Sequence, residues 1–361
     1  MIQHLWREGF LSRSELTGRM GLSANSVGTL ANGLIRMGVL AEQTPRPSNG
    51  GRPRVPLGLD ATRCEVVGLS IRPGLVGAAR LNLAGNLVGR GIQKKISDPA
   101  KLTAAAASLI EPIIGPETLS VGLAAPGFVD PKARAILYSA AGDGRGSISL
   151  AALEKVVGKR PLLIENDMHA LSARWLLTHR AVEAEDVLLV YINDGSVGAA
   201  VMIDGRPNRG SVRGGNELGH MRFPVETDAC YCGQKGCLER ICSSRFLAAG
   251  GCDQTLLEAA EGVGDSMHRR MEELMNHLSA GIANAANFIR PHRLVLVSPM
   301  IRFPAFTSEL TRMIRTRLLQ ELTDRVRLEL WDRPVGSLAE TAGWLAIAGL
   351  FCDGWLPEET V

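Results

Sequence analysis

The cysteines of this 361-residue chain are concentrated in one short segment. Three of the seven fall within eight residues, in the stretch CYCGQKGC, and the nearest histidine lies ten residues before them. Two glycines in the stretch allow the backbone to fold sharply, so that three sulfur atoms can converge. A structural zinc ion takes four thiolate or imidazole ligands and leaves no open position. The spacing therefore predicts a structural Zn²⁺ site made of His220, Cys230, Cys232 and Cys237.

Two alternatives stay open for this segment: a group of free thiols with no common role, and redox chemistry. A disulfide between Cys230 and Cys232 would be strained, and the segment lacks the C-x-x-C spacing of thioredoxin-type couples. The remaining cysteines are expected to be small buried apolar residues, at positions Cys64, Cys242, Cys252 and Cys352.

The composition excludes several classes of protein. Hydrophobic residues make up 45% of the chain and charged residues 21%, as in globular proteins, and the length predicts two or three domains. No run of about 18 apolar residues is present to span a membrane. The first residues lack a signal-peptide pattern, and an odd number of cysteines is unlike a secreted disulfide framework. We therefore expect a cytoplasmic protein.

The net charge of +3 originates in the first sixth of the chain. Residues 1–60 contain seven arginines and four acidic residues, whereas basic and acidic residues balance over the rest. A polyanionic partner would therefore be met near the N-terminus, although a solvated surface gives the same charge.

The first 42 residues have the pattern of a helix-turn-helix, with apolar residues at helical spacing. Ser12 or Ser14 can cap a first helix, and Gly21 supplies a tight turn after it. Ser23 can cap a second helix over residues 24–37, which would enter the major groove of DNA. A three-helix protein-interaction module is the alternative. The residues expected to contact bases are Asn25, Ser26 and Thr29.

Residues 39–59 are expected to form a β-wing, in which two strands are joined by a loop rich in proline and glycine. Arginines on such a loop suit phosphate groups or the narrow minor groove. These arginines are Arg46, Arg52 and Arg54. Residues 1–60 are thus predicted to form a winged helix-turn-helix DNA-binding domain.

After residue 60 the pattern changes to alternating strands and helices, which predicts a mixed α/β fold with helices on both faces of its sheets. Two strand-rich halves suggest two lobes around a cleft. We expect strands over residues 65–70, 77–83, 120–125, 161–165, 187–192, 199–203 and 293–298. We expect helices over residues 103–114, 150–157, 169–178, 267–290, 305–321 and 337–352.

Four segments together resemble the ROK family of repressors, open reading frames and sugar kinases. ELGH, followed after ten residues by CYCGQKGCLE, is similar to the family's cysteine motif. SELTGRMGLSANSV and GGRPRVPLGL resemble the winged helix-turn-helix of its repressors, VGLAAPGFVD its proline-glycine segment and IENDMHAL its Asn-Asp segment. The resemblance implies a two-lobed, actin-like (ribonuclease H-like) α/β ROK domain over residues 61–361. It also implies a hexose-type site, structural zinc and a homodimer or homotetramer.

The resemblance assigns sugar binding to Asn166, Asp167, Glu217, His220 and Glu239. Carboxylates and amides suit this role, because sugar hydroxyls both donate and accept hydrogen bonds. His220 could ligate zinc with one ring nitrogen and contact the sugar with the other. In ROK kinases the aspartate at position 167 is the general base. On the residues alone, Asn166 and Asp167 could simply cap the following helix.

The segments that would hold ATP depart from the family pattern at three places. Residues 70–74 (SIRPG) stand where the kinases have Asp-x-Gly-Gly-Thr, and residues 194–200 (DGSVGAA) replace a glycine-rich phosphate loop. Ser298-Pro299 replaces a double glycine on the adenosine side. Fewer glycines leave fewer free amides for phosphate, and an aspartate repels it. We therefore expect no kinase activity.

One departure concerns the sugar pocket itself. Residues 139–145 lack the Asn and Trp of the family's Ser-Pro-Asn-Leu-x-Trp segment, and Asp143 or Arg145 could supply replacement contacts. The combined prediction is a repressor that binds operator DNA and responds to a sugar or sugar phosphate. The alternatives are a sugar kinase with an added DNA-binding head, and a regulator whose cleft is vestigial and which responds to a protein partner.

Overall fold

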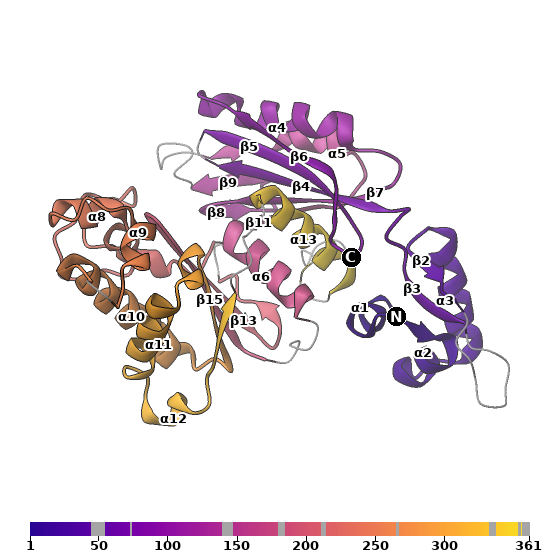
Figure 1. Cartoon of the computed structure of the whole chain (residues 1–361). Helices are drawn as coiled ribbons and strands as arrows, with labels where there is room; N and C mark the ends of the chain where they lie inside the picture. Colours follow the sequence, from indigo (N-terminus) through magenta and orange to yellow (C-terminus); the bar gives the residue numbers. More distant parts are fainter. Residues whose placement is uncertain are drawn as a thin grey trace.

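The computed structural model describes residues 1–44, 55–72, 74–138, 147–179, 185–210, 214–264, 267–331, 337–352 and 355. Its N-terminal head contains three helices and a small antiparallel sheet of order β1-β3-β2. Figure 1 shows the head beside the two lobes of the body. The elements of the head are α1 (Ile2–Glu8), β1 (Leu11–Ser12), α2 (Arg13–Met20), α3 (Ala24–Arg36), β2 (Leu40–Glu42) and β3 (Pro56–Leu59).

The predicted capping residues begin the two helices that follow β1. The Ser12 hydroxyl accepts from the Glu15 backbone N–H, and the Glu15 carboxylate accepts in return from the Ser12 N–H, which forms a capping box. Gly21 adopts a left-handed conformation with φ 62° and ends α2. Ser23 caps α3 by accepting from the Ser26 N–H. The two helices and the turn between them are therefore present as predicted.

The first lobe contains a five-stranded sheet of order β11-β7-β4-β5-β6. Strands β11, β7 and β4 are parallel, and β5 and β6 continue the sheet antiparallel. One face packs on α4 and α5 and the other on α13. The bounds are β4 (Glu65–Arg72), β5 (Leu75–Asn82), β6 (Leu87–Lys95), β7 (Thr118–Ala125), β11 (Leu162–Asn166), α4 (Leu102–Ile110), α5 (Ala151–Val157) and α13 (Leu338–Phe351).

Two glycines bring α13 close to this sheet. A Cβ atom at Gly68 would lie 1.9 Å from the Ala339 carbonyl oxygen, and one at Gly122 would lie 2.1 Å from that of Ala342. Only glycine permits this approach of helix backbone to strand backbone. The contact fixes α13 on the first lobe.

The second lobe contains a five-stranded sheet of order β14-β13-β12-β15-β16. One face packs on α10 and α11, and the other packs on α6. Because α6 also packs against α13, these two helices lie between the two sheets (Figure 1). The bounds are β12 (Val187–Asn193), β13 (Ser196–Ile203), β14 (Arg206–Pro207), β15 (Arg293–Val297), β16 (Arg327–Trp331), α6 (Asp167–Thr178), α10 (Arg269–Ile289) and α11 (Pro304–Arg315).

Shorter elements complete the described part of the chain. Strands β8 (Phe128–Asp130), β9 (Ala135–Tyr138) and β10 (Ile148–Ser149) form a small antiparallel sheet of order β10-β9-β8. The short helices are α7 (Leu238–Ile241), α8 (Ser244–Ala249), α9 (Leu256–Glu261) and α12 (Gln320–Thr323). Four 3₁₀ turns are η1 (Pro99–Lys101), η2 (Glu111–Ile113), η4 (Leu218–His220) and η5 (Pro299–Arg302). No helix in the described part is long and apolar enough to cross a membrane.

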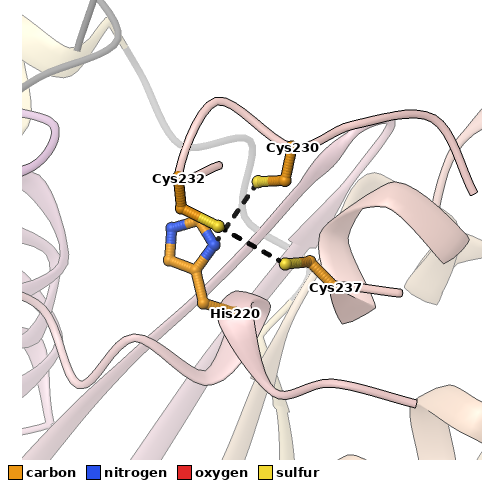
Figure 2. A group of neighbouring side chains, drawn as sticks. All are labelled: His220, Cys230, Cys232 and Cys237. Atoms are coloured by element: carbon orange, nitrogen blue, oxygen red, sulfur yellow. Dashed lines mark hydrogen bonds between the residues drawn. The ribbon is translucent and has the colours of Figure 1, made fainter. Parts of the chain in front are cut away.

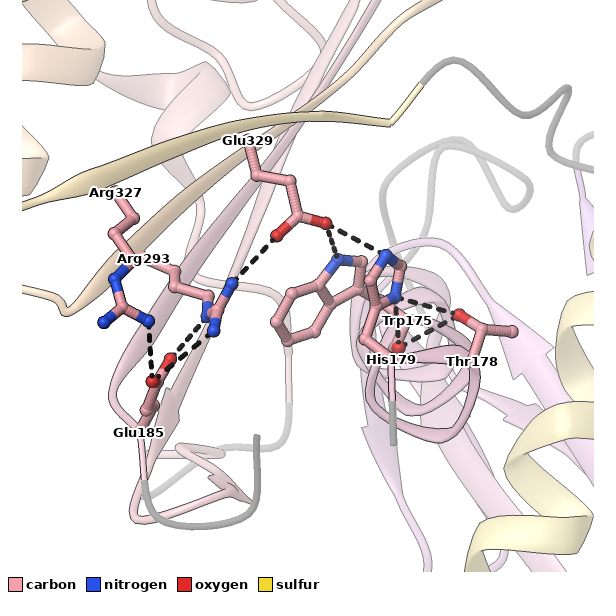
Figure 3. Close-up of polar contacts among 7 residues, drawn as sticks. All are labelled: Trp175, Thr178, His179, Glu185, Arg293, Arg327 and Glu329. Carbon is pink, nitrogen blue, oxygen red and sulfur yellow. Dashed lines mark hydrogen bonds and ion pairs between the residues drawn. The ribbon is translucent and has the colours of Figure 1, made fainter. Parts of the chain in front are cut away.

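Polar contacts join the end of α6 to the second lobe (Figure 3). The Glu329 carboxylate on β16 accepts from Trp175 Nε1 at 3.2 Å and lies 2.9 Å from His179 Nε2. Arg293 on β15 approaches Glu329 at 3.4 Å and also pairs with Glu185. The hydrogen bond that His179 donates to Glu329, more than any other contact, raises the pKa of His179. This cluster ties the C-terminal end of α6 to β15 and β16.

The head contacts the body through α1. Trp6 Nε1 donates to the Leu177 carbonyl oxygen, near the end of α6, at 2.9 Å. The Trp6 ring also lies 5.9 Å, between ring centroids, from both Trp344 and Phe351 of α13. In Figure 1, α1 lies between the rest of the head and the body. The first helix of the head therefore rests on both helices that separate the two sheets.

Candidate functional site

The four predicted metal ligands converge (Figure 2). His220 ends η4, Cys230 and Cys232 lie on the loop that follows, and Cys237 is the N-cap of α7. Their ligand atoms all lie within 4.8 Å of one another. The Sγ atom of Cys230 is 3.6 Å from His220 Nδ1, and the Sγ atoms of Cys232 and Cys237 are 3.6 Å apart.

Two glycines give the cysteine loop its shape, as the sequence predicts. Gly233 and Gly236 have φ of 85° and 76°. A Cβ atom at Gly236 would lie 2.3 Å from the Phe223 carbonyl oxygen, so no larger residue fits there. The Gly236 N–H donates to the Thr227 hydroxyl at 2.9 Å, which holds the turn in place. The loop is thus a rigid support for its three sulfur atoms.

The donor set fits a tetrahedral metal ion. With metal–sulfur bonds of about 2.3 Å, two thiolates of such a site lie about 3.8 Å apart, close to the observed separation. Burial, with the Glu239 carboxylate next, raises the pKa of the Cys230 thiol. A cation is therefore needed to hold thiolates here, and three sulfurs with one imidazole could bind a metal ion.

The orientation of His220 separates its two ring nitrogens. Nδ1 faces the cysteines, whereas Nε2 lies 3.0 Å from the Tyr231 hydroxyl and 3.5 Å from Glu217. When Nδ1 ligates a metal, the neutral ring carries its proton on Nε2 and can only donate there. A metal ion would thus turn His220 into a fixed donor directed at the Tyr231 hydroxyl and at Glu217, and at anything bound beside them.

The structure also brings together the predicted sugar-binding carboxylates. Burial first, and then the charges of Asp167 and Glu239, raise the pKa of Glu217 to about 7. Glu239 is 6% exposed, and its Oε1 lies 4.0 Å from His220 Nδ1. Burial raises the pKa of Asp167 as well. The three carboxyl groups and His220 therefore share one region, where carboxyl oxygens can accept hydrogen bonds from sugar hydroxyls and Glu217, in its protonated form, can donate one.

Asn166 ends β11 and has a structural role. Its side-chain oxygen accepts from the Met168 N–H at 2.8 Å, so it caps α6, and its amide donates to the Gly127 carbonyl at 2.8 Å. The capping role considered from the sequence is therefore confirmed for Asn166. A Cβ at Gly215 would lie 3.1 Å from Asn166 Oδ1, so the chain leading to Glu217 passes directly over this cap.

The loop over residues 194–200, which the sequence predicts to have lost phosphate binding, contains a carboxylate, Asp194, that accepts hydrogen bonds from the protein itself. The Asp194 carboxylate accepts from the Ser244 N–H at 2.7 Å and from the Ser244 hydroxyl, at the start of α8. Asp194 thus accepts from a backbone N–H at the start of a helix, where unpaired N–H groups commonly bind anions. The neighbouring Gly195 N–H donates to the Cys242 carbonyl at 2.8 Å and is also engaged. Asp194, Ser244 and Arg240 line part of a cavity of about 870 Å³.

The predicted DNA contacts are divided between described and undescribed residues. Asn25, Ser26 and Thr29 are exposed on α3, opposite its buried residues Val27 and Ala31. The Ser26 hydroxyl also lies 2.9 Å from Ser23 Oγ, within the helix cap. The predicted wing arginines, Arg46, Arg52 and Arg54, lie outside the described residues, as do Asp143 and Arg145.

Arg36 is a candidate that the sequence analysis missed. It is exposed near the end of α3, and no described residue forms an ion pair or hydrogen bond with it. Arg13 and Arg19 instead pair with Glu42 and Glu8. Arg36 is seven residues beyond Thr29, which is two helical turns, and so lies on the same face. That spacing could have identified it from the sequence.

Comparisons with known proteins give a family match and several relatives. The family model described as the ROK family matches residues 97–348. The xylose repressor of Bacillus subtilis is 22% identical over 100% of this chain and 96% of the relative. The xylose repressor of Caldicellulosiruptor bescii is 22% identical over 79% of this chain and 78% of the relative. An N-acetyl-D-glucosamine kinase of Salmonella newport is 28% identical over 55% of this chain and 71% of the relative.

Solved structures share the fold at low sequence identity. A ROK family transcriptional regulator, a homologue of the E. coli MLC protein, superposes with a TM-score of 0.73 at 20% identity, over 93% of this chain and 92% of the other. A ROK family glucokinase of Streptomyces griseus, in complex with glucose and AMPPNP, gives 0.61 at 19% identity, over 78% of this chain and 99% of the other. The predicted two-lobed α/β fold is confirmed by these likenesses.

Proposed function

The chain belongs to the ROK family, and on that premise we propose that it is a DNA-binding transcriptional repressor that responds to a sugar or sugar derivative. The observation that carries the proposal is the N-terminal head. The Bacillus relative named a xylose repressor matches the whole chain, head included, whereas the glucokinase covers 78% of it. A head with two capped helices joined by a glycine turn is the part that a kinase does not require.

The head, residues 1–60, is proposed to bind operator DNA as a winged helix-turn-helix. The exposed face of α3 would enter the major groove, because its polar side chains are short and its buried face packs on the head. A homodimer or homotetramer would present two heads to a palindromic operator. The residues proposed to contact bases or phosphates are Asn25, Ser26, Thr29 and Arg36, together with the wing residues Arg46, Arg52 and Arg54.

The body, residues 61–361, is proposed to bind the sugar in the cytoplasm. Hydroxyl groups would contact Glu217, Glu239 and His220, with Asp167 beside them and Asn166 holding the start of α6. A structural Zn²⁺ ion would be held by His220, Cys230, Cys232 and Cys237. The ion would supply no chemistry beyond charge and geometry, and its effect is to fix the donor direction of His220.

Helix α6 offers a physical path from the sugar to the DNA. It begins at Asp167, beside the sugar-binding residues, and its Leu177 carbonyl accepts the hydrogen bond from Trp6 of the head. A ligand that favours one position of α6 would therefore favour one position of α1. Such coupling works only when the ligand binds the two arrangements with different affinity.

Kinase activity is the second candidate function, and the bonds formed by Asp194 support the proposal that it is absent. A carboxylate already bonded to the donors at the start of α8 leaves them unavailable to a phosphate group. Ser298 caps η5, and Pro299 follows it without a backbone N–H. We therefore propose that the protein does not transfer phosphate from ATP.

Binding to its own promoter DNA tests the proposed function. Purified protein should shift a promoter fragment, and Arg36→Ala should weaken binding at every sequence while lowering the slope of log K against log salt by about 1. Arg63→Ala is the matched control, because Arg63 is an exposed arginine next to the head that lies outside α3. Absence of salt-sensitive binding by the wild type would refute the proposal.

A further inference from the structure

Arg72 ends the first strand of the parallel part of the first sheet. Ser70 of β4 aligns with Ala124 of β7, and Asn166 of β11 aligns with Ala125, so the three strands end at the same level. Arg72 and Asp167 therefore follow the carboxyl ends of strands that are about 10 Å apart, with β7 between them. In open α/β sheets, ligands bind beyond these carboxyl ends.

The positive charge of Arg72 acts on ionisable groups from both lobes, in the region between the two sheets. Burial raises the pKa of Asp167, which begins α6, and the positive charge of Arg72 opposes this rise. Burial likewise raises the pKa of Tyr191, which lies on β12 of the other sheet, and Arg72 again opposes the rise. A cation that influences groups from both lobes lies close to the sugar-binding carboxylates and on the side of Asp167.

The N–H donors of Arg72 have no acceptor among the described residues. Half-buried Arg72 forms no hydrogen bond and no ion pair with any residue that the structure describes. Other half-buried arginines of the same lobe are engaged. Arg80 pairs with Glu65 at 3.4 Å, Arg134 pairs with Glu154 at 3.3 Å, and Arg160 donates to two backbone carbonyls in addition to its own turn. A half-buried guanidinium without partners is costly, and its five N–H donors match planar or tetrahedral anions.

We propose that Arg72 binds an anionic substituent of the sugar, such as a phosphate or a carboxylate group. The inference rests on the proposed sugar site and narrows its ligand to a class. Glu217, Glu239 and His220 would take the hydroxyl groups of the ring, and Arg72 would take the charged group at the opposite end. The anion would lie beside Arg72, the cation on the Asp167 side of the site, because Glu217 and Glu239 at the His220 side repel an anion.

The experiment compares neutral and anionic sugars directly. Calorimetric titrations use glucose, mannose and N-acetylglucosamine, each with its 6-phosphate, together with glucuronate and inorganic phosphate. The wild type should bind at least one anionic sugar ten times or more tightly than its neutral parent. A preference for glucuronate over the 6-phosphates would identify a carboxylate as the anion, and the reverse preference would identify a phosphate.

Arg72→Gln keeps a polar side chain and removes the charge. This variant should weaken binding of the anionic sugar by tenfold or more, and should leave the neutral parent within about threefold. Arg90→Gln, which changes an exposed arginine of β6 in the same sheet, should bind both forms as the wild type does. Circular dichroism melts of both variants should match the wild type, so that a loss of affinity is not a loss of fold.

Two results would overturn the proposal. In the first, the wild type binds neutral sugars as tightly as anionic ones, and Arg72 then only balances the charge of Asp167. In the second, Arg72→Gln weakens both forms equally. Neither result affects promoter binding, which is measured separately. Failure of this proposal therefore remains distinct from failure of the proposed repressor function.

Discussion

At the scale of single residues, the metal site determines what His220 can offer to a ligand. Nδ1 faces the thiols and Nε2 faces Glu217, so one metal bond decides which nitrogen carries the proton. Burial, with the Glu239 carboxylate next, raises the pKa of the Cys230 thiol, so this thiol ionises readily only when a cation is bound beside it. Metal binding and sugar binding are therefore expected to be lost together.

Cys232→Ser tests that dependence. The variant should retain far less than one equivalent of zinc after dialysis, and should bind its sugar at least tenfold more weakly, because His220 loses its fixed orientation. Elemental analysis and calorimetry provide the two readouts. Cys252→Ser, at a buried cysteine outside the cluster, should keep both zinc and affinity. Full zinc content in Cys232→Ser would refute the metal assignment.

His179 predicts a pH dependence of stability at the end of α6. Its pKa is raised by the bond to Glu329, although the neighbouring Arg293 opposes this. The contact therefore contributes stability below the unfolded pKa of about 6.5, and this contribution disappears as the pH rises through the folded value. His179→Gln should lower the stability by about 1 kcal/mol at pH 6 and by less at pH 8.5.

Thermal melts at the two pH values measure this effect. A Glu329→Gln variant should lose more stability than His179→Gln, because Glu329 also accepts from Trp175 and pairs with Arg293. The double variant should lose little more than Glu329→Gln alone, because the contact with His179 is already weakened there. An equal effect of His179→Gln at pH 6 and pH 8.5 would show that the charge of His179 does not contribute.

At the scale of elements, α6 connects the two proposed functions. Asn166 caps its first turn beside the sugar-binding residues, and Leu177 near its end accepts from Trp6. Its flank packs on α13 and on the second sheet, so it is a rigid element with neighbours on all sides. A small displacement of such a helix is transmitted along its length.

Trp6→Phe tests the contact between α6 and the head. Phenylalanine keeps an aromatic ring against Trp344 and Phe351, and it removes the bond to the Leu177 carbonyl, which is worth about 1 kcal/mol, together with part of the indole ring. Promoter affinity without ligand should stay within about threefold, whereas release of DNA by the sugar should become several times weaker. Fluorescence anisotropy with labelled promoter DNA measures both quantities.

Trp344→Phe is the matched control for that variant. Trp344 packs against the same ring and forms no hydrogen bond with α6 among the described residues, so its variant should keep the response to sugar. A Trp6→Phe protein that releases DNA as readily as the wild type would exclude this path.

The sequence predicted elements best where one local signal decided them. Ser12, Ser23 and Gly21 cap and separate the two helices of the head where expected, and the apolar strands of both sheets lie where their hydrophobic runs indicate. Strand β6 was missed, because it is an exposed edge strand without apolar alternation. The expected helix over 305–321 was wrong in extent, since α11 ends at Arg315 and α12 is separate.

In the candidate site, too, features with a local sequence signal were predicted, and features that depend on distant contacts were not. The cysteine cluster follows from spacing within one loop, and it was predicted in full. Contacts between distant segments could not be predicted: the Trp6 bond to Leu177 joins residues 171 positions apart, and the Asp194 bonds to Ser244 join residues 50 apart. No local pattern encodes which helix end meets which loop. The place of Arg72 near Asp167 likewise depends on strand register.

At the scale of the whole molecule, we expect a protein without catalytic activity. Coupled ADP-release assays over a panel of hexoses and hexose phosphates should give no turnover above background, because Asp194 already occupies the donors at the start of α8. Turnover of about 1 s⁻¹ or more, the low end of ordinary enzymes, would support a kinase with an added head instead.

The most direct test of the central claim is DNA release by a sugar. Anisotropy of a labelled promoter fragment is followed as the protein is titrated at two salt concentrations, with and without each sugar or sugar phosphate. The account predicts tight, salt-sensitive binding and loss of affinity with at least one of these ligands. Binding that no sugar or sugar phosphate changes would contradict a sugar-responsive repressor.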